Sequence, residues 1–256
     1  MLQGLTQSHT AAEVAYSAVS GVSGGGVNAA ILGSYAVGSE SAAAQRMLQF
    51  WQNSTQTKLY HDWVGGWIQG LTVEPGLYNN KPLHGFLTTE LADIGPMQRF
   101  TDVGLTNVLT GAFVDNTATL DTNLTDVMFA SFAYAGFFPP AESMGNTWFD
   151  GAVIWDLDIF SAVNKCLETH VQAEVVVDVL LTSEKTLKTV DAANYNSVEM
   201  GIRFLEVSRY YGAMDGLLRA QFAYPEVQFR NVIAPSSPLA STHLPLVSQP
   251  KLPILT

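Results

Sequence analysis

The sequence has few charged side chains and a single cysteine. Of its 256 residues 14% are charged, and 12 basic against 23 acidic side chains give a formal charge of −11. Binding to nucleic acid or to anionic membranes depends on clusters of Lys and Arg, and the sequence contains no such cluster. The lone Cys166 excludes an internal disulfide framework and a site built from several thiolates. We therefore expect no nucleic-acid partner, no metal and no cofactor.

Targeting and membrane-spanning signals are also missing from the sequence. The first 21 residues have neither a basic segment nor a continuous apolar run, so we expect no signal peptide. Residues 14–39 carry no charge, but Ser, Gly and Asn interrupt them throughout, which argues against a transmembrane helix. Composition identifies neither the compartment nor the oligomeric state.

What the sequence does have is material for a large buried core. Hydrophobic residues make up 47% of the chain, which excludes intrinsic disorder. Apolar runs alternate with helical periodicity, a pattern typical of an α/β fold with a mostly parallel sheet and helices on both faces. We expect one domain over residues 1–235 and a proline-rich extension over residues 236–256.

The expected elements follow from these patterns. Short apolar runs predict strands over residues 14–20, 107–114, 147–153, 174–182 and 227–233. Helical spacing predicts helices over residues 26–37, 41–53, 124–133, 158–169 and 197–222.

A glycine-rich turn lies between the first expected strand and the first expected helix. Residues Gly21–Gly25 read GVSGG and fit G-x-S-x-G, in which a serine sits on a sharp strand-to-helix turn with its hydroxyl exposed. A simple Gly-rich turn with a solvent-facing Ser23 fits equally well. Residues Gly24–Ala29 also match a dinucleotide-binding pattern, but its acidic residue should follow a second strand, and Glu40 lies in helical sequence instead.

A nucleophilic serine needs a base. An α/β-hydrolase order would restrict the choice of histidine to His170 and His243, and both look like surface residues. Asp150 is the better candidate, because it ends an apolar segment beside the small residues Gly151 and Ala152. An ordinary Asp-Gly turn is the alternative interpretation.

Together the two motifs resemble those of the patatin-like phospholipases, whose signatures are G-x-S-x-G and D-G-A/G. Residues Leu77–Leu83 and Ala130–Pro140 are similar to two further segments of that family, in the same order, with Ala135 where proline is usual. The likeness runs from about residue 2 to residue 235.

The resemblance implies a three-layer α/β fold and a lipid acyl hydrolase of the phospholipase A type. Ser23 would be the nucleophile and Asp150 the general base, with no histidine and no metal. The surrounding motif residues would be Gly21, Gly24, Gly25, Gly151 and Ala152. The substrate would be a phospholipid or another acyl lipid.

The sequence departs from the family pattern ahead of the nucleophile. The family carries a Gly-rich loop there that supplies most of the oxyanion hole, and residues 1–5 resemble the helix that follows that loop. Gly24 N–H would remain as one donor. We expect an N-terminally incomplete version of an active enzyme; the alternative is a catalytically impaired module that binds lipid or protein.

Aromatic residues near the second motif are candidates for an acyl channel, although such residues more often pack in a core. They are Phe132, Phe137, Phe138 and Trp148. Residues His61–Ile68 form a Gly-hinged aromatic stretch that suits transient contact with a membrane surface, or else a loop packed on the core.

Overall fold

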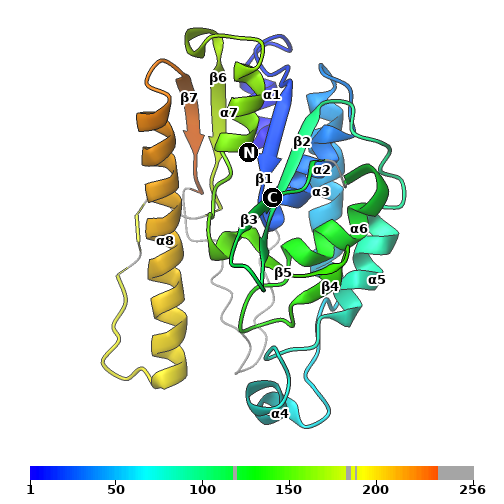
Figure 1. Ribbon diagram of the computed structural model, residues 1–256, viewed down its shortest axis with the longest axis vertical. Helices are drawn as coiled ribbons and strands as arrows, with labels where there is room; N and C mark the ends of the chain where they lie inside the picture. The colour runs from blue at the N-terminus through cyan, green and yellow to red at the C-terminus, as the bar shows by residue number, and fades with distance from the viewer. Residues whose placement is uncertain (118–119, 183–185, 188, 236–256) are drawn as a thin grey trace.

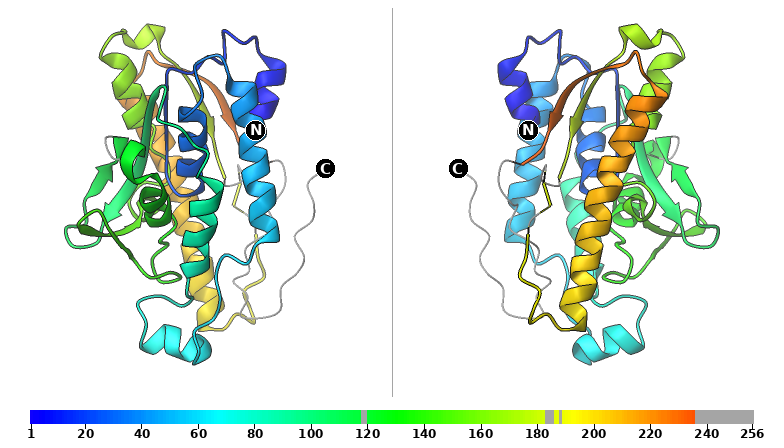
Figure 2. Two further views of the ribbon diagram at one scale, coloured as in Figure 1. Left: turned by 90° about the vertical axis from the view of Figure 1, so that its right-hand side faces the viewer. Right: turned by 90° about the vertical axis from the view of Figure 1, so that its left-hand side faces the viewer.

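The computed structural model describes residues 1–117, 120–182, 186–187 and 189–235, and Figure 1 shows its arrangement. The expected α/β class is confirmed: helices flank a central sheet. Helices α2 and α3 lie on one side of strand β1 and helix α7 lies on the other, which makes three layers (Figure 2). The proline-rich extension expected over residues 236–256 lies outside the described residues.

Two parallel strand pairs carry the fold, and short antiparallel strands extend one of them. The strands are β1 (Ala18–Gly21), β2 (Phe100–Asn107), β3 (Phe113–Asp115), β4 (Ala141–Ser143), β5 (Asn146–Asp150), β6 (Val176–Leu180) and β7 (Gln228–Ile233). Strands β1 and β2 pair in parallel, as do β6 and β7. Strands β3 and β5 pair antiparallel with β2, and β4 pairs antiparallel with β5.

The helices are α1 (Leu2–Ser8), α2 (Gly24–Gly33), α3 (Glu40–Gln56), α4 (Gly66–Thr72), α5 (Lys81–Glu90), α6 (Leu120–Ser131), α7 (Phe160–Leu167) and α8 (Ser197–Ala223), with 3₁₀ turns η2 (Gly151–Val153) and η3 (Gln172–Glu174). Helix α8 runs along the edge formed by β6 and β7 (Figure 1). No helix within the described ranges is both long and apolar enough to cross a membrane.

One expected strand is wrong. The strand predicted over residues 107–114 lies earlier, as β2, and residues 108–112 form the turn between β2 and β3. In that turn Asn107 Oδ1 accepts hydrogen bonds from the backbone N–H groups of Leu109 and Thr110, both at 3.0 Å. The polar residues Thr101, Asp102 and Thr106 are buried in β2, so the strand lacks the apolar run that identifies a buried strand in a sequence.

A buried ion pair fixes where β1 and β2 begin. The Arg99 side chain is fully buried and donates to Glu40 Oε1 at 2.7 Å. Its other N–H groups donate to the carbonyl oxygens of Tyr16, Tyr35 and Ala36. Since Tyr16 precedes β1, Tyr35 and Ala36 lie in the loop between α2 and α3, and Glu40 begins α3, this one side chain joins these segments.

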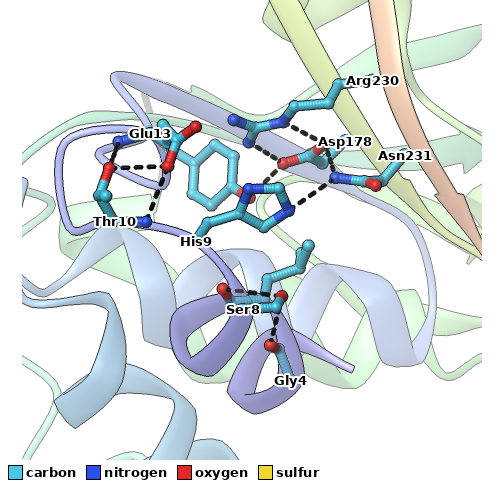
Figure 3. Close-up of polar contacts among 10 residues, drawn as sticks. Gly4, Ser8, His9, Thr10, Glu13, Asp178, Arg230 and Asn231 are labelled. Atoms are coloured by element: carbon cyan, nitrogen blue, oxygen red, sulfur yellow. Dashed lines mark hydrogen bonds and ion pairs between the residues drawn. The ribbon is translucent and has the colours of Figure 1, made fainter.

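A second polar cluster joins the segment before β1 to the β6–β7 pair (Figure 3). Asp178 on β6 accepts hydrogen bonds from Tyr16 Oη, from Asn231 Nδ2 at 2.8 Å and from the Arg230 guanidinium. Burial alone would raise the pKa of Asp178, but the hydrogen bonds from Arg230, Tyr16 and Asn231 hold it below its usual value. His9 lies at the edge of the cluster, 3.4 Å from Asn231.

We predict that Tyr16→Phe lowers the free energy of unfolding by about 2 kcal/mol at pH 7, because a hydrogen bond to a charged group is lost. The lowered pKa of Asp178 means that this stabilisation is present above its unfolded pKa and disappears as the pH falls through the folded value. Urea unfolding at pH 7 and below pH 4 measures both effects. The control Tyr35→Phe should change stability by less than about 0.5 kcal/mol; an equal loss at both pH values for Tyr16→Phe contradicts the prediction.

Candidate active site

Ser23 occupies a strained turn between β1 and α2. Its φ is 55° and its ψ is −131°, a left-handed conformation that residues other than glycine seldom adopt. The turn is sharp enough that a Cβ on Gly21 would lie 2.4 Å from the Gly25 carbonyl oxygen. Only glycine therefore fits at position 21, and the chain reverses directly from strand to helix with Ser23 at its apex.

Close packing of α2 on β2 depends on a different glycine of the same run. A Cβ on Gly26 would lie 2.8 Å from Val103 Cγ1, so a side chain there would push the helix away from the sheet. A Cβ on Gly25 would meet nothing within 4 Å. The second glycine of the G-x-S-x-G pattern, Gly25, is thus not required by packing, whereas Gly21 and Gly26 are.

Asp150 is the last residue of β5 and is only 1% exposed. Its backbone N–H donates to the Ala133 carbonyl oxygen at 3.1 Å, and its Oδ1 accepts from the Ala152 N–H at 2.9 Å. A Cβ on Gly151 would lie 2.4 Å from the Gly104 carbonyl oxygen and 2.8 Å from Val22 Cγ1. The Asp-Gly pair therefore ends a strand where its backbone touches β2 and the Ser23 turn.

The carboxyl group of Asp150 has a raised pKa of about 6. Burial is the largest cause, and it is opposed by hydrogen bonds from the Ala152 N–H and the Ser23 side chain and by the charge of Arg209. The Ser23 side chain thus lies near enough to Asp150 to lower the pKa of its carboxyl group. A carboxyl with this pKa is a better proton acceptor near neutral pH than an ordinary aspartate.

Arg209 on α8 supplies the positive charge that acts on Asp150. Its Nη2 lies 3.0 Å from Asp156 Oδ1, and its guanidinium lies over the Tyr134 ring at 5.1 Å from the ring centroid. Burial raises the pKa of the Tyr134 hydroxyl. Arg209, Asp156 and Tyr134 form a polar wall beside the buried carboxyl.

The first turn of α2 offers hydrogen-bond donors next to Ser23. The N–H of Gly26 bonds to the carbonyl oxygens of Val22 and Ser23, whereas Gly24 and Gly25 are the first two helical residues, whose N–H groups have no partner within the helix. Such N–H groups, together with the helix dipole, favour an anion at this position.

A strained serine, a buried aspartate of raised pKa and a helix start meet at one point, and the comparison with known families agrees with that geometry. Residues 2–163 match the family model described as patatin-like phospholipase. The chain is a patatin-like phospholipase family member. No curated protein matches the chain at the same stringency. The patatin-like family is in general a family of lipid acyl hydrolases, and the chain belongs to that family.

The residues expected to form the patatin-like site come together in part. The Ser23 side chain lies near enough to Asp150 to lower its pKa, Gly21 and Gly24 belong to the Ser23 turn, and Gly151 and Ala152 follow Asp150 directly. The aromatic candidates divide: Trp148 is 5% exposed inside the main hydrophobic core, and Phe132 packs against the same core. Phe137 stacks on Tyr134, beside Arg209. Phe138 lies against Tyr60, farther along the same segment.

Other residues near the proposed site belong to no recognisable sequence motif. The Trp51 ring on α3 would be 3.2 Å from a Cβ on Gly24, and its Nε1 donates to Asn28 Oδ1 at 2.8 Å. Ser131 Oγ donates to the Ser23 carbonyl oxygen at 3.4 Å. Arg209 lies on α8, outside the residues that the family model matches. Sequence spacing gives no indication of these contacts, because each joins segments that are far apart in the chain.

We predict that Asp150→Asn raises the free energy of unfolding by about 2–3 kcal/mol at pH 7, since one pKa unit corresponds to about 1.4 kcal/mol. The folded state binds the Asp150 proton more tightly than the unfolded state, so wild-type stability falls as the pH rises from about 4 to about 6. Urea unfolding across that range measures the difference. At pH 4 the two proteins should be nearly equal, and the exposed Asp62→Asn should match wild type throughout; a variant that is destabilised at pH 7 contradicts the prediction.

Proposed function

We propose that this protein is a phospholipase A-type lipid acyl hydrolase, which cleaves carboxylic esters of membrane lipids through an acyl-enzyme on Ser23 with Asp150 as general base. The observation that carries the proposal is a serine at the apex of a strained strand-to-helix turn, near enough to the buried Asp150 carboxyl to influence its pKa of about 6.

In the acylation step Ser23 Oγ attacks the ester carbonyl carbon and its proton passes to Asp150. The carbonyl oxygen becomes an oxyanion beside the N–H groups of Gly24 and Gly25, where the start of α2 favours negative charge. When the tetrahedral intermediate collapses, the bond to the alcohol breaks and Asp150 returns the proton to the departing oxygen. The products of this step are the alcohol and an acyl ester on Ser23.

Deacylation repeats the same proton transfers with water. Asp150 accepts a proton from water, whose oxygen attacks the acyl carbon, and the proton then goes to Ser23 Oγ as the fatty acid leaves. Arg209 keeps part of the Asp150 population ionised, because its charge opposes the effect of burial on the pKa. The reaction needs no group beyond these side chains and water.

The excursion between His61 and Asn79, which contains α4, fits contact with a lipid surface. The backbones of these two residues bond to each other at 3.0 and 2.9 Å and close its base. Residues 63–73 carry no charged side chain in a protein of net charge −11. Five apolar side chains on the excursion are exposed: Val64, Trp67, Ile68, Leu71 and Val73.

Polar groups of this excursion face inward instead. Gln69 accepts from the Gly65 N–H at 2.8 Å and donates to Glu74 at 2.7 Å, and Trp63 Nε1 donates to the Gly76 carbonyl oxygen at 3.0 Å. A lobe that satisfies its polar groups internally and exposes apolar side chains is suited to insertion among lipids. The absence of charge from residues 63–73 favours a neutral membrane over an anionic one, which the charge of the protein would repel.

The lobe is connected by hydrogen bonds to the segment beside Asp150. The N–H groups of Leu77 and Tyr78 donate to the carbonyl oxygens of Gly136 and Phe137, at 3.2 and 2.9 Å. The same segment begins at Ala133, whose carbonyl oxygen accepts the Asp150 N–H. Figures 1 and 2 show α4 projecting at one end of the molecule. Contact of α4 with a bilayer would therefore bring lipid next to the excursion that is hydrogen-bonded to the segment beside Asp150.

We predict that a fluorophosphonate probe labels the protein. The Ser23→Ala substitution should lower the rate of labelling at least 100-fold, because the probe reacts only with an activated serine. Ser34→Ala, at the other end of α2, should label like wild type. Gel fluorescence against time gives the rates. Equal labelling of the Ser23→Ala protein, or none of wild type, would overturn the assignment of Ser23 and favour a module that binds lipid or protein without catalysis.

The rate of labelling should rise with pH to half its maximum at about pH 6, because Asp150 accepts the proton only when ionised. Arg209→Gln should move this midpoint to higher pH, since the Arg209 charge lowers the pKa of Asp150. Arg219→Gln, an exposed arginine on the same helix, is the matched control and should leave the midpoint unchanged.

We predict that the double variant Trp67→Ser/Leu71→Ser loses at least tenfold in binding to neutral phosphatidylcholine vesicles, since each buried apolar side chain contributes about 1.5–3 kcal/mol. Hydrolysis of vesicle lipid should fall in parallel. Fluorophosphonate labelling should stay the same, because neither residue touches Ser23 or Asp150. Vesicle sedimentation and fatty-acid release measure the two effects.

Val171→Ser is the control for this experiment. Val171 is 63% exposed and belongs to the connection between α7 and β6. This connection lies at the end of the molecule opposite α4 (Figure 1). The Val171→Ser substitution removes exposed apolar surface without changing the excursion between His61 and Asn79, so this variant should bind vesicles like wild type. An equal loss in both variants, or no loss in the double variant, contradicts the role of α4.

A further inference from the structure

Three aspartates from separate segments converge on the α7 side of the sheet. Asp102 lies on β2, Asp115 ends β3 and Asp158 precedes α7. One carboxylate oxygen from each lies within 4.8 Å of the other two. The chain thus brings three negative groups together at a point where β2, β3 and α7 meet.

Two of the six carboxylate oxygens are buried without a hydrogen-bond partner. Within the described residues, Asp102 Oδ2 and Asp158 Oδ2 accept no hydrogen bond, and the two residues are 0% and 5% exposed. A buried carboxylate oxygen that lacks a donor costs several kcal/mol, so such atoms require an explanation.

The partner oxygens of the same carboxylates are held by hydroxyl groups. Thr117 Oγ1 donates to Asp102 Oδ1 at 2.8 Å, and Ser161 Oγ donates to Asp158 Oδ1 at 2.7 Å. Ser161 Oγ also lies 3.2 Å from Asp115 Oδ1. These bonds fix the orientation of all three carboxylates and leave Oδ2 of Asp102 and of Asp158 for another ligand.

A cavity of about 460 Å³ reaches this cluster from the surface. Asp115, Thr117 and Ser161 belong to its lining, together with the aromatic rings of Phe100, Trp155 and Phe160. Neither Ser23 nor Asp150 lines it. Of the three aspartates only Asp115 lines the cavity, so an ion would reach the buried Asp102 and Asp158 past Asp115.

The charges of the cluster also repel one another. One carboxylate oxygen of each aspartate lies within 4.8 Å of the other two, so the ionised groups oppose one another. A positively charged ligand among the three carboxylates would remove this repulsion and supply the missing partners.

We propose that Asp102, Asp115 and Asp158 bind one divalent cation, Ca²⁺, at a site separate from the proposed catalytic centre. The ligands are all hard oxygen atoms, which Ca²⁺ and Mg²⁺ prefer. Ca²⁺ takes 6–8 oxygens at 2.3–2.6 Å in irregular geometry, so its ligand atoms lie up to about 5 Å apart, whereas Mg²⁺ demands a tighter octahedron. The bound ion clamps β3 and the start of α7 onto β2.

Thermal unfolding of the chelator-treated full chain tests the proposal. At 100 times its dissociation constant, one bound Ca²⁺ should raise Tm by roughly 5–10 °C at pH 7.5, and titration calorimetry should give one site per chain. Mg²⁺ should give a smaller shift. An equal response to Mg²⁺ would overturn the assignment to calcium, and no response to either ion would overturn the site.

Asp115→Asn is the informative variant, because Asp115 is exposed at the end of a short strand and its loss should not prevent folding. It should weaken Ca²⁺ binding at least tenfold. Glu168→Gln, which removes a charge from the same cavity but not from the cluster, should bind Ca²⁺ like wild type. A response to Ca²⁺ that is the same in wild type and Asp115→Asn would mean adventitious binding elsewhere.

The opposing explanation is a proton shared between Asp102 and Asp158. In that case Tm in chelator should rise as the pH is lowered from 8 to 6, Asp102→Asn should abolish that rise, and Ca²⁺ should have no effect on wild type. That combination would overturn the proposal. Because every readout is stability or stoichiometry, the result is independent of whether Ser23 is a nucleophile.

Discussion

The close approach of three backbone segments, at Val22, Gly104 and Gly151, is the constraint on which the site depends. A Cβ on Gly104 would lie 2.1 Å from the Phe113 ring and 2.9 Å from Val22 Cγ1, and one on Gly151 would collide with the Gly104 carbonyl. With a side chain at position 104 or 151, β5 would be displaced from β2 and the Asp150 carboxyl would move away from Ser23. The two short motifs therefore have one physical purpose, because Gly21 makes the turn sharp and Gly151 lets the second strand reach it.

The buried acids of this protein differ mainly in whether a cation accompanies them. Asp178 and Glu40 pair with Arg230 and Arg99, and the pKa of Asp178 is lowered. Arg209 acts on Asp150 by its charge without forming an ion pair with it, and Asp102 lies among other acidic groups. Burial is therefore the largest influence on both carboxyl groups, and it raises both pKa values. The paired acids hold segments together, as buried ion pairs do when all donors are satisfied. The unpaired ones lower stability, and such groups gather at sites that bind or react.

The sequence alone predicted the α/β class, most of the elements and the patatin-like family. Those predictions depend on local signals, namely apolar runs, helical spacing and short glycine-containing motifs that predict a sharp turn. Strand β2 was not predicted because its buried positions include the polar residues Thr101, Asp102 and Thr106, which interrupt the apolar run. Gly25 shows the converse, since it satisfies the motif although nothing in the packing demands a glycine there.

Residues that act through long-range contacts could not be found in this way. Arg209 meets Asp156 across 53 positions, and Asp102, Asp115 and Asp158 converge only because β2, β3 and α7 pack together. Neither set has a spacing that distinguishes it from ordinary surface charge. The uncharged stretch at residues 63–73 is different, because its composition is visible in the sequence. What the sequence leaves open there is orientation, and the inward-facing Gln69 beside the exposed Trp67 resolves it in favour of an outward apolar face.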